Sequence, residues 1–274
     1  MPDSPSKEPP VRNPSICLTL RCTVVAGLFG LATAHAASLG TSGYSQNFDA
    51  MGTTGTAAPI DWTVYTGASG TSNTTWSTTI PGSGVAAMVP TTAALTATTT
   101  PNGTNNNGFN AALSASATSD RVLATSPTQV SGAALQVVLT NDTGAAVDSL
   151  SVGYDTVRFT SVSTANELPG YWLFYSLDNT TWTNVSSLNP TIATVPNTVG
   201  VTSTAGSFSL GASVAPGASI ELRWVDDNAV QTSPDQIIGL NNVVVAAVPE
   251  ADGFALALAG LAFTGLLAAR RRKA

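Results

Sequence analysis

Short stretches of alternating apolar and polar residues dominate the second half of the chain. Leu150, Val152 and Tyr154 alternate with Ser and Gly, and Ile220, Leu222 and Trp224 alternate with charged residues. A period of two puts alternate side chains on one face, so each stretch predicts a strand with one buried face. We therefore expect Trp224 to be buried. Briefer alternating stretches lie at 157–159 and 208–210, apolar runs lie at 135–139 and 171–175, and the last strand reaches 243–245.

Turn-forming residues separate these stretches. Asp178 and Asn179 lie between an apolar run and Trp182, which predicts a hairpin turn. Residues 37–131 are dominated by Gly, Thr, Ser, Asn and Ala and alternate less, and the Asn-rich segment 98–108 predicts an exposed loop. Short strands between turns predict an all-β fold, a single β-sandwich or jelly-roll domain.

The first 36 residues have the three parts of a secretion signal. Three basic residues precede position 22, an uncharged apolar run covers 23–32, and Ala34-His35-Ala36 forms a small-x-small site. This order predicts a signal peptide at 1–36, cleaved after Ala36, with signal peptidase and the export machinery as partners. An uncleaved anchor or a core helix is the alternative, although the run is short for a membrane span.

Residues 248–274 also have three parts. Pro249, Glu250 and Ala251 come first, an uncharged apolar run covers 254–269, and the chain closes on basic residues. As a helix the run would extend over roughly 24 Å, which predicts a transmembrane segment of minimal length. Basic residues stay on the cytoplasmic side of a membrane, so they would orient the helix with the domain outside. They are Arg270, Arg271, Arg272 and Lys273.

This three-part tail resembles the PEP-CTERM sorting signal of Gram-negative bacteria, in which a Pro-Glu-Pro motif precedes a hydrophobic helix and an Arg-rich end. The resemblance implies recognition by exosortase, a membrane protease-transpeptidase. The chain departs from the pattern at Ala251, where a second Pro is usual. A plain single-span anchor, which would keep the tail, is the alternative.

Charge restricts the chemistry of the segment between these ends. Residues 37–247 contain three Arg and twelve acidic residues, a net charge of −9, and no Lys, His or Cys. A domain this acidic repels phosphate backbones, which argues against nucleic acid as a partner. Disulfides and zinc sites built from Cys and His are excluded, and a hydroxyl nucleophile would lack a His or Lys base.

Carboxylates are the remaining candidates for chemistry. Glu221 alternates with apolar residues, so we interpret it as a solvated strand residue rather than half of a hydrolytic pair. Asp226, Asp227 and Asp235 could supply oxygen ligands to calcium, together with Asn228. A loop of solvated acids is the preferred interpretation, so we predict no metal, no other cofactor and no catalytic residue.

The five Trp residues could form a sugar-stacking platform, although core packing is the preferred interpretation for most of them. A second resemblance concerns residues 44–246, which look like a β-sandwich module common in exported bacterial proteins. It depends on Gln46-Asn47-Phe48-Asp49, on the run 222–228, and on Leu240-Asn241-Asn242, where an acidic pair is usual.

Together these features predict a non-enzymatic exported protein of the cell surface or extracellular matrix, associated with exopolysaccharide or biofilm. The alternative is a carbohydrate-binding surface protein with polysaccharide as its partner, and a secreted hydrolase ranks third. The predicted division is a signal at 1–36, a β-sandwich at 37–247 and a sorting tail at 248–274.

Overall fold

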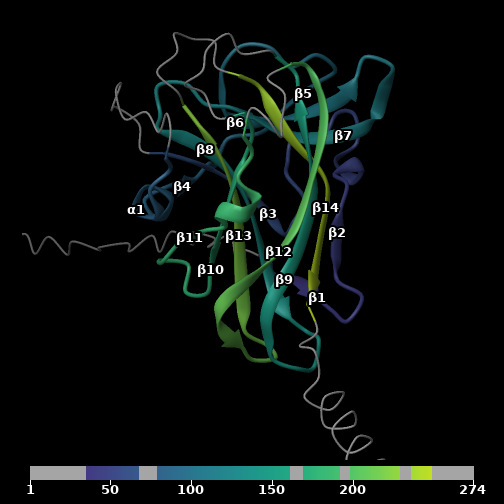
Figure 1. Ribbon diagram of the computed structural model, residues 1–274. Coiled ribbons are helices and arrows are strands. Elements are labelled where there is room, and N and C mark those ends of the chain that lie inside the picture. Colours follow the sequence, from purple (N-terminus) through teal and green to yellow (C-terminus); the bar gives the residue numbers. More distant parts are fainter. Residues whose placement is uncertain (1–34, 68–78, 161–168, 192–197, 229–235, 249–274) are drawn as a thin grey trace, which may run out of the picture. The chain divides into compact units, whose positions relative to one another are not determined.

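The computed structural model describes residues 35–67, 79–160, 169–191, 198–228 and 236–248. These residues form two packed β-sheets, a sandwich-like arrangement that confirms the predicted all-β class (Figure 1). Helical structure among them is confined to α1 (Gly82–Ala86) and two 3₁₀ turns at Asp49–Met51 and Ser186–Leu188. None of the helices within these ranges is long and apolar enough to cross a membrane.

The first sheet has the strand order β11-β10-β13-β8-β3-β4, and β1 pairs in parallel with the end of β8. Its two longest strands, β8 and β13, pair antiparallel over nine residues, from Ser219 opposite Thr140 to Asp227 opposite Gly132. The strands are β1 (Ala37–Leu39), β3 (Trp62–Thr66), β4 (Val89–Pro90), β8 (Gly132–Asn141), β10 (Trp172–Ser176), β11 (Thr183–Asn184) and β13 (Ser219–Asp227).

The second sheet has the strand order β12-β9-β14-β7-β6-β5. One edge of β14 pairs first with β7 and then with β2, and an irregularity separates the two pairings. From β7 onward, successive long strands alternate between the two sheets. The strands are β2 (Tyr44–Gln46), β5 (Thr96–Thr98), β6 (Asn105–Ser114), β7 (Ala117–Ser126), β9 (Val147–Arg158), β12 (Gly200–Val214) and β14 (Ile238–Ala247).

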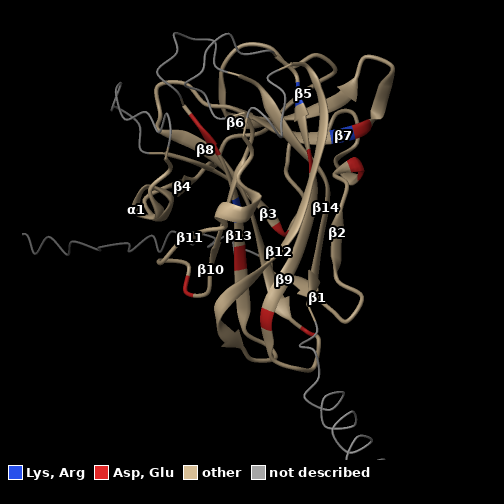
Figure 2. Cartoon of the chain, in the orientation of Figure 1, with Lys and Arg blue, Asp and Glu red and all other residues tan. Residues whose placement is uncertain are grey.

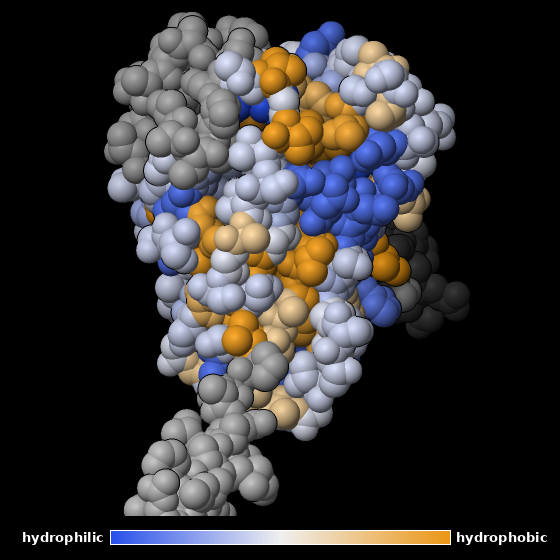
Figure 3. All heavy atoms as spheres, turned by 45° about the vertical axis from the view of Figure 1, so that its right-hand side comes forward, coloured by the Kyte–Doolittle hydropathy of each residue, from blue (hydrophilic) through white to orange (hydrophobic). Residues whose placement is uncertain are grey.

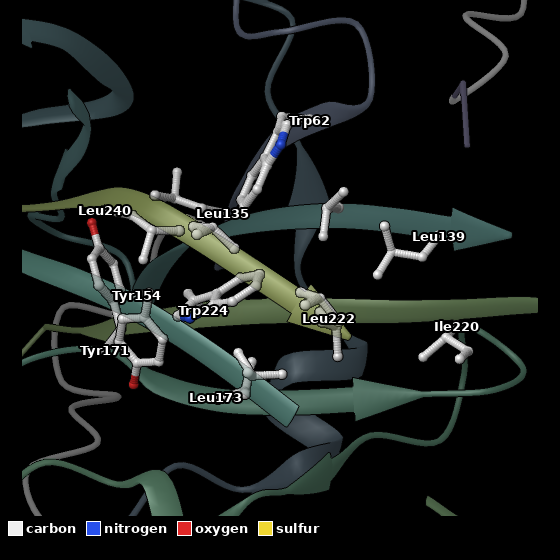
Figure 4. Packing of buried hydrophobic residues seen from close by; sticks show 14 of the residues in the cluster. Trp62, Leu135, Leu139, Tyr154, Tyr171, Leu173, Ile220, Leu222, Trp224 and Leu240 are labelled. Atoms are coloured by element: carbon white, nitrogen blue, oxygen red, sulfur yellow. The ribbon is translucent and has the colours of Figure 1, made fainter. Parts of the chain in front are cut away.

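The main core lies between the sheets and is centred on Trp224. This side chain is fully buried, as the alternation predicts, and so are Ile220 and Leu222 on the same face of β13. Figure 4 shows the Trp224 ring among side chains of both sheets. Its centroid lies 5.5 Å from that of Trp62 on β3 and 5.8 Å from that of Tyr154 on β9. The predicted strand faces of β8, β9 and β13 are therefore confirmed.

The other face of β13 is covered as well. A second cluster of buried residues packs there, formed by α1, its flanking loop and the outer faces of β8, β10 and β13. A strand in the middle of a sheet that is covered on both sides has no solvated face. Both sets of alternating residues in β13 are therefore buried, the charged ones included.

The hairpin β6–β7 lies in the half of the chain where alternation is weak. The predicted loop at 98–108 is wrong at its end, because β6 begins at Asn105. Asn side chains there are bonded inside the protein: Asn105 Nδ2 donates to the Gly108 carbonyl (2.8 Å) and Asn106 Nδ2 to the Thr128 carbonyl (2.9 Å). These local bonds allow amide-rich sequence to form a strand.

The predicted hairpin at Asp178 is confirmed, because β10 and β11 pair antiparallel on either side of it. Asn179 has a φ of 56°, a left-handed conformation that Asn adopts more readily than most residues. The Asp178 carboxylate accepts hydrogen bonds from the Thr180 and Thr181 backbone amides (2.8 and 2.6 Å), which lower its pKa well below the usual range.

Candidate functional site

Two of the three Asp residues considered for calcium lie inside the domain rather than in a solvated loop. Asp226 and Asp227 lie on β13 and are fully buried, so that interpretation is wrong for both. Neighbours on a strand point to opposite faces, which separates their carboxylates. Asp235 lies outside the described residues, as do Ala34, the motif 249–251 and the basic cluster 270–273.

Asp226 instead links the two sheets. Thr125 Oγ1 on β7 donates to Asp226 Oδ2 at 2.6 Å. The Tyr171 hydroxyl lies 2.9 Å from Thr125 Oγ1 and donates to the Ile238 carbonyl of β14 at 3.0 Å. Burial and the Asp226 charge raise the pKa of Tyr171 well above its usual value, so the hydroxyl keeps its proton. Charge-assisted bonds are stronger than bonds between neutral groups, so this network helps to hold the two sheets together.

Glu221 is also buried, which contradicts its predicted exposure. It lies on the covered outer face of β13, opposite Ser176 of β10 and Val138 of β8, and only 7% of its surface is exposed. Its Oε2 atom has no hydrogen-bond partner. Burial is the main cause that raises the pKa of this carboxyl, and the nearby Asp178 charge adds to the effect.

Glu221→Gln should therefore gain stability relative to wild type as the pH rises. The folded state holds the Glu221 proton to higher pH than the unfolded chain does, so ionisation lowers the free energy of unfolding above the ordinary pKa of 4.5. We expect a gain on the order of 1 kcal/mol at neutral pH, the scale of a buried acceptor without a partner. Urea unfolding at pH 4 and pH 8 measures it.

Asp178→Asn provides a control with the opposite sign. The pKa of Asp178 is lowered in the fold, so its contribution to stability is present above the ordinary value of 3.8 and is lost as the pH falls. The stability lost in this variant should shrink on acidification. Parallel pH profiles for the two variants would contradict both assignments.

The Trp residues that the structure describes do not form an exposed platform. Trp62, Trp182 and Trp224 are 4%, 6% and 0% exposed, and Trp172 is half-buried. Trp76 lies outside the described residues. Packing in the cores accounts for these rings, in agreement with the preferred interpretation of their role.

All three Arg residues of 37–247 are buried, which the sequence analysis did not anticipate. Arg121, Arg158 and Arg223 are each at most 2% exposed. The Arg223 guanidinium lies between the rings of Tyr65 and Trp182, 4.0 Å from each centroid. Its Nε donates to Gln136 Oε1 at 2.8 Å. Burial lowers the pKa of Arg223 to about 10, so it remains charged at neutral pH.

Arg121 holds the N-terminal segment against the second sheet. Its Nε donates to Asn110 Oδ1 at 2.7 Å, and its backbone N–H donates to Asp49 Oδ1 at 2.7 Å. Asn110 Nδ2 in turn donates to the carbonyls of Gly52 and Gly55, both at 2.8 Å. The segment Gln46-Asn47-Phe48-Asp49, noted for its resemblance to an exported module, is thus joined to the β6–β7 hairpin by a buried polar network.

Burial of the Arg side chains leaves carboxylates as the charges on the outside of the described domain. Asp49, Asp142 and Asp178 are exposed, and four further Asp residues are half-buried. Figure 2 shows the acidic positions scattered over several strands and loops of both sheets. Such a surface repels other polyanions over about 8 Å at physiological ionic strength. The four half-buried residues are Asp61, Asp120, Asp148 and Asp155.

The irregularity in β14 brings amides and acids together. Asn241 Nδ2 donates to Asp120 Oδ1 (3.1 Å), and Asn242 Nδ2 donates to Asp155 Oδ2 (2.8 Å). Asn242 has a φ of 48°, which turns the strand between its two pairings. The resemblance expects acids at 241 and 242. Here Asn241 and Asn242 carry no charge, and their amide groups donate hydrogen bonds to the neighbouring carboxylates.

A hollow of about 300 Å³ lies beside this irregularity, between β2 and β14. This side of the domain comes forward in Figure 3, which shows a contiguous hydrophilic patch below a group of apolar residues. Within the described ranges, no three His, Cys, Asp or Glu side chains are grouped closely enough to hold a metal ion. The hollow is lined by Ser45, Gln46, Asn47, Asn242, Val243 and Val244.

Comparison with known proteins leaves the family open. No protein-family model matches the chain, and no curated protein matches it. Among solved structures, an arabinose-bound MgGH51 α-L-arabinofuranosidase is similar over 78% of this chain at 12% sequence identity, with a TM-score of 0.30. The chain spans 29% of that enzyme chain's length. A TM-score this low carries no argument about fold or activity.

Proposed function

We propose that the chain is an exported, non-enzymatic protein of the cell surface or extracellular matrix. The observation that carries this proposal is the distribution of charge: the three Arg residues of 37–247 are buried, and the exposed charges described there are acidic. A net charge of one sign keeps an exported domain soluble. Nucleic acid is accordingly not proposed as a partner.

Three features of the carboxylates support the absence of catalysis. Asp226 is bonded between the sheets, Glu221 is buried between β8 and β10 beside the Asp178 turn, and Asp120 and Asp155 accept bonds from Asn side chains. A hydrolytic pair needs two carboxyls about 5–10 Å apart across a cleft that a substrate can enter. The buried acids cannot meet a polymer, and the sequence offers no Lys, His or Cys in 37–247 to replace them.

The proposed boundaries of the mature domain lie next to the first and last strands of the sheets. β1 begins at Ala37, directly after the proposed cleavage site, and β14 ends at Ala247, directly before the proposed tail. The alternation of long strands between the sheets supports the jelly-roll form of the sandwich. In this proposal the tail anchors the domain until an exosortase-like protease acts at Pro249-Glu250-Ala251.

Replacing Arg270, Arg271 and Arg272 by Gln should release the protein from the cell envelope, because neutral residues no longer hold the end of the chain on the cytoplasmic side. Immunoblots of envelope, matrix and medium fractions measure the release, and mass spectrometry of the wild-type protein should find a start at Ala37 and no residues beyond 269. A triple Arg-to-Lys variant is the matched control. It keeps the charge, so it should be retained.

Two results would contradict these assignments. Wild-type protein found in the cytoplasm with residues 1–36 intact would exclude export. Surface-exposed protein that still contains 270–274 would exclude removal of the tail and leave a plain anchor.

A carbohydrate-binding role is the second candidate, and the hollow at β14 favours it. Hydroxyl and amide groups from Ser45, Gln46 and Asn47 gather there with Asn242, and such groups hydrogen-bond sugars. Asn242→Gly removes the amide and still allows the positive φ. Glycans bound by the wild-type protein on an array should be lost in this variant. A glycan that both proteins bind equally would exclude the hollow.

A further inference from the structure

Each sheet has an outer strand at either end of its strand order, and these four outer strands differ greatly in length. β4 and β11 have two residues each and β5 has three, whereas β12 has fifteen. Within the described part of the chain, β12 pairs with β9 alone. Its ten residues from Gly200 to Ser209 follow β9 in uninterrupted register, and the irregularity comes after them. Alternate backbone N–H and C=O groups of this segment therefore point away from the sheet.

Outer strands of natural proteins are usually protected against pairing with another chain by charged residues, Pro, bulges or shortness. β12 lacks these devices over 200–209: it contains no charged residue and no Pro. Its side chains on the solvent face are small or short, namely Val201, Ser203, Ala205, Ser207 and Ser209. A second strand could lie against this edge without a steric or electrostatic obstacle from the strand itself.

We propose that β12 is a self-association edge, at which a second copy of this chain adds its own β12 in antiparallel orientation and extends the second sheet. The charge distribution favours a second copy at this place, because like-charged copies repel each other wherever acids are exposed. The nearest described carboxylate, Asp155 on β9, lies opposite Ser203. At least three strand spacings, about 14 Å, would separate the two Asp155 residues, which exceeds the screening length of about 8 Å.

The strand is also compatible with its own reversed copy. A two-fold axis at Ala205 would place Ser203 opposite the second copy's Ser207, and Val201 opposite the second copy's Ser209. These pairs are small, and hydroxyl pairs across strands can hydrogen-bond. An interface of this kind uses the same patch on both copies and closes as a dimer. The inference is independent of the function proposed above, since it depends only on the described strands.

Hydrogen exchange of the full-length chain tests the edge directly. The chain is kept in a mild detergent so that the apolar run 254–269 is covered equally in every sample. We expect sedimentation to show a dimer that forms with increasing protein concentration, and amides of 200–209 to become protected over the same range. A chain that stays monomeric, or a dimer that protects other residues and not these, would overturn the proposal.

Charge placed on the edge provides the matched variants. Ala205→Lys and Ala205→Glu each put like charges face to face, so each should weaken dimerisation by about tenfold or more. An equal mixture of the two should restore it, which a misfolded variant could not do. Ala145→Lys adds the same charge at an exposed turn and should leave dimerisation unchanged. Equal dimerisation of Ala205→Lys and Ala145→Lys, or no recovery in the mixture, would refute pairing through β12.

Discussion

Trp224→Ala should lower the free energy of unfolding by about 3–5 kcal/mol, the range found for buried aromatic residues replaced by Ala. Trp224 is fully buried and lies between Trp62 of its own sheet and Tyr154 of the opposite sheet. Removing the indole leaves a cavity at the place where the two sheets meet, and close-packed neighbours fill such a cavity only in part. Urea-induced unfolding, followed by circular dichroism, measures the loss.

Ile60→Ala is the control for this experiment. Ile60 is 78% exposed, so its truncation removes little buried surface and should change stability by less than about 0.5 kcal/mol. Trp224→Phe keeps an aromatic ring in the cavity and should fall between the two. Equal stability of Trp224→Ala and Ile60→Ala would mean that the β13 face is not part of the core.

The sequence predicted the strands whose two faces differ in polarity. β9 and the core face of β13 are recognisable because large apolar residues recur at every second position. The outer face of β13 was misread for a physical reason. Glu221 and Arg223 alternate with core residues and so look solvated, but both are buried, and Arg223 donates to the Val85 carbonyl of α1, more than a hundred residues earlier. A local pattern contains no information about a cover formed by a distant segment.

The hairpin β6–β7 illustrates a second limit. Its interior positions are filled by small residues, among them Ala111, Ala112 and Ala124, which give little contrast against Ser and Thr. Bulky residues make a strand visible in sequence, whereas here close approach of small side chains lets the segment be buried. Composition thus concealed two of the longer strands of the second sheet.

The partners of the buried polar side chains were also not predictable from the sequence. The sequence showed that Arg is rare in 37–247, but not that each guanidinium is buried beside uncharged partners such as Gln136 and Asn110. The one usable signal was rarity itself, because three Arg residues and no Lys in 37–247 are too few to keep a surface solvated. Asn241 and Asn242 were noted for the resemblance, and the structure adds their acidic partners on neighbouring strands.

Arg223→Met should cost about 3 kcal/mol, although Met fills much of the same space. The variant loses the contact of the guanidinium with the Tyr65 and Trp182 rings, a cation–π interaction worth about 2 kcal/mol when desolvated. It also leaves the Gln136 carbonyl oxygen and the Val85 carbonyl, both acceptors of Arg223, without their donor. A buried acceptor without a partner costs about 1–3 kcal/mol.

A double-mutant cycle with Gln136→Leu separates the hydrogen bonds from the ring contacts. Gln136→Leu alone removes the single oxygen that accepts from two N–H groups of the charged Arg223, so it should be destabilising. In the double variant neither group remains unsatisfied, so its loss should be smaller than the sum of the two single losses by at least about 1 kcal/mol. Arg121→Met combined with Gln136→Leu is the control, because Arg121 bonds Asn110 and shares no partner with Gln136. Those two losses should add. Additive losses in the Arg223 cycle as well would mean that the buried bond to Gln136 contributes nothing to stability, and that the stacked rings alone hold the guanidinium in place.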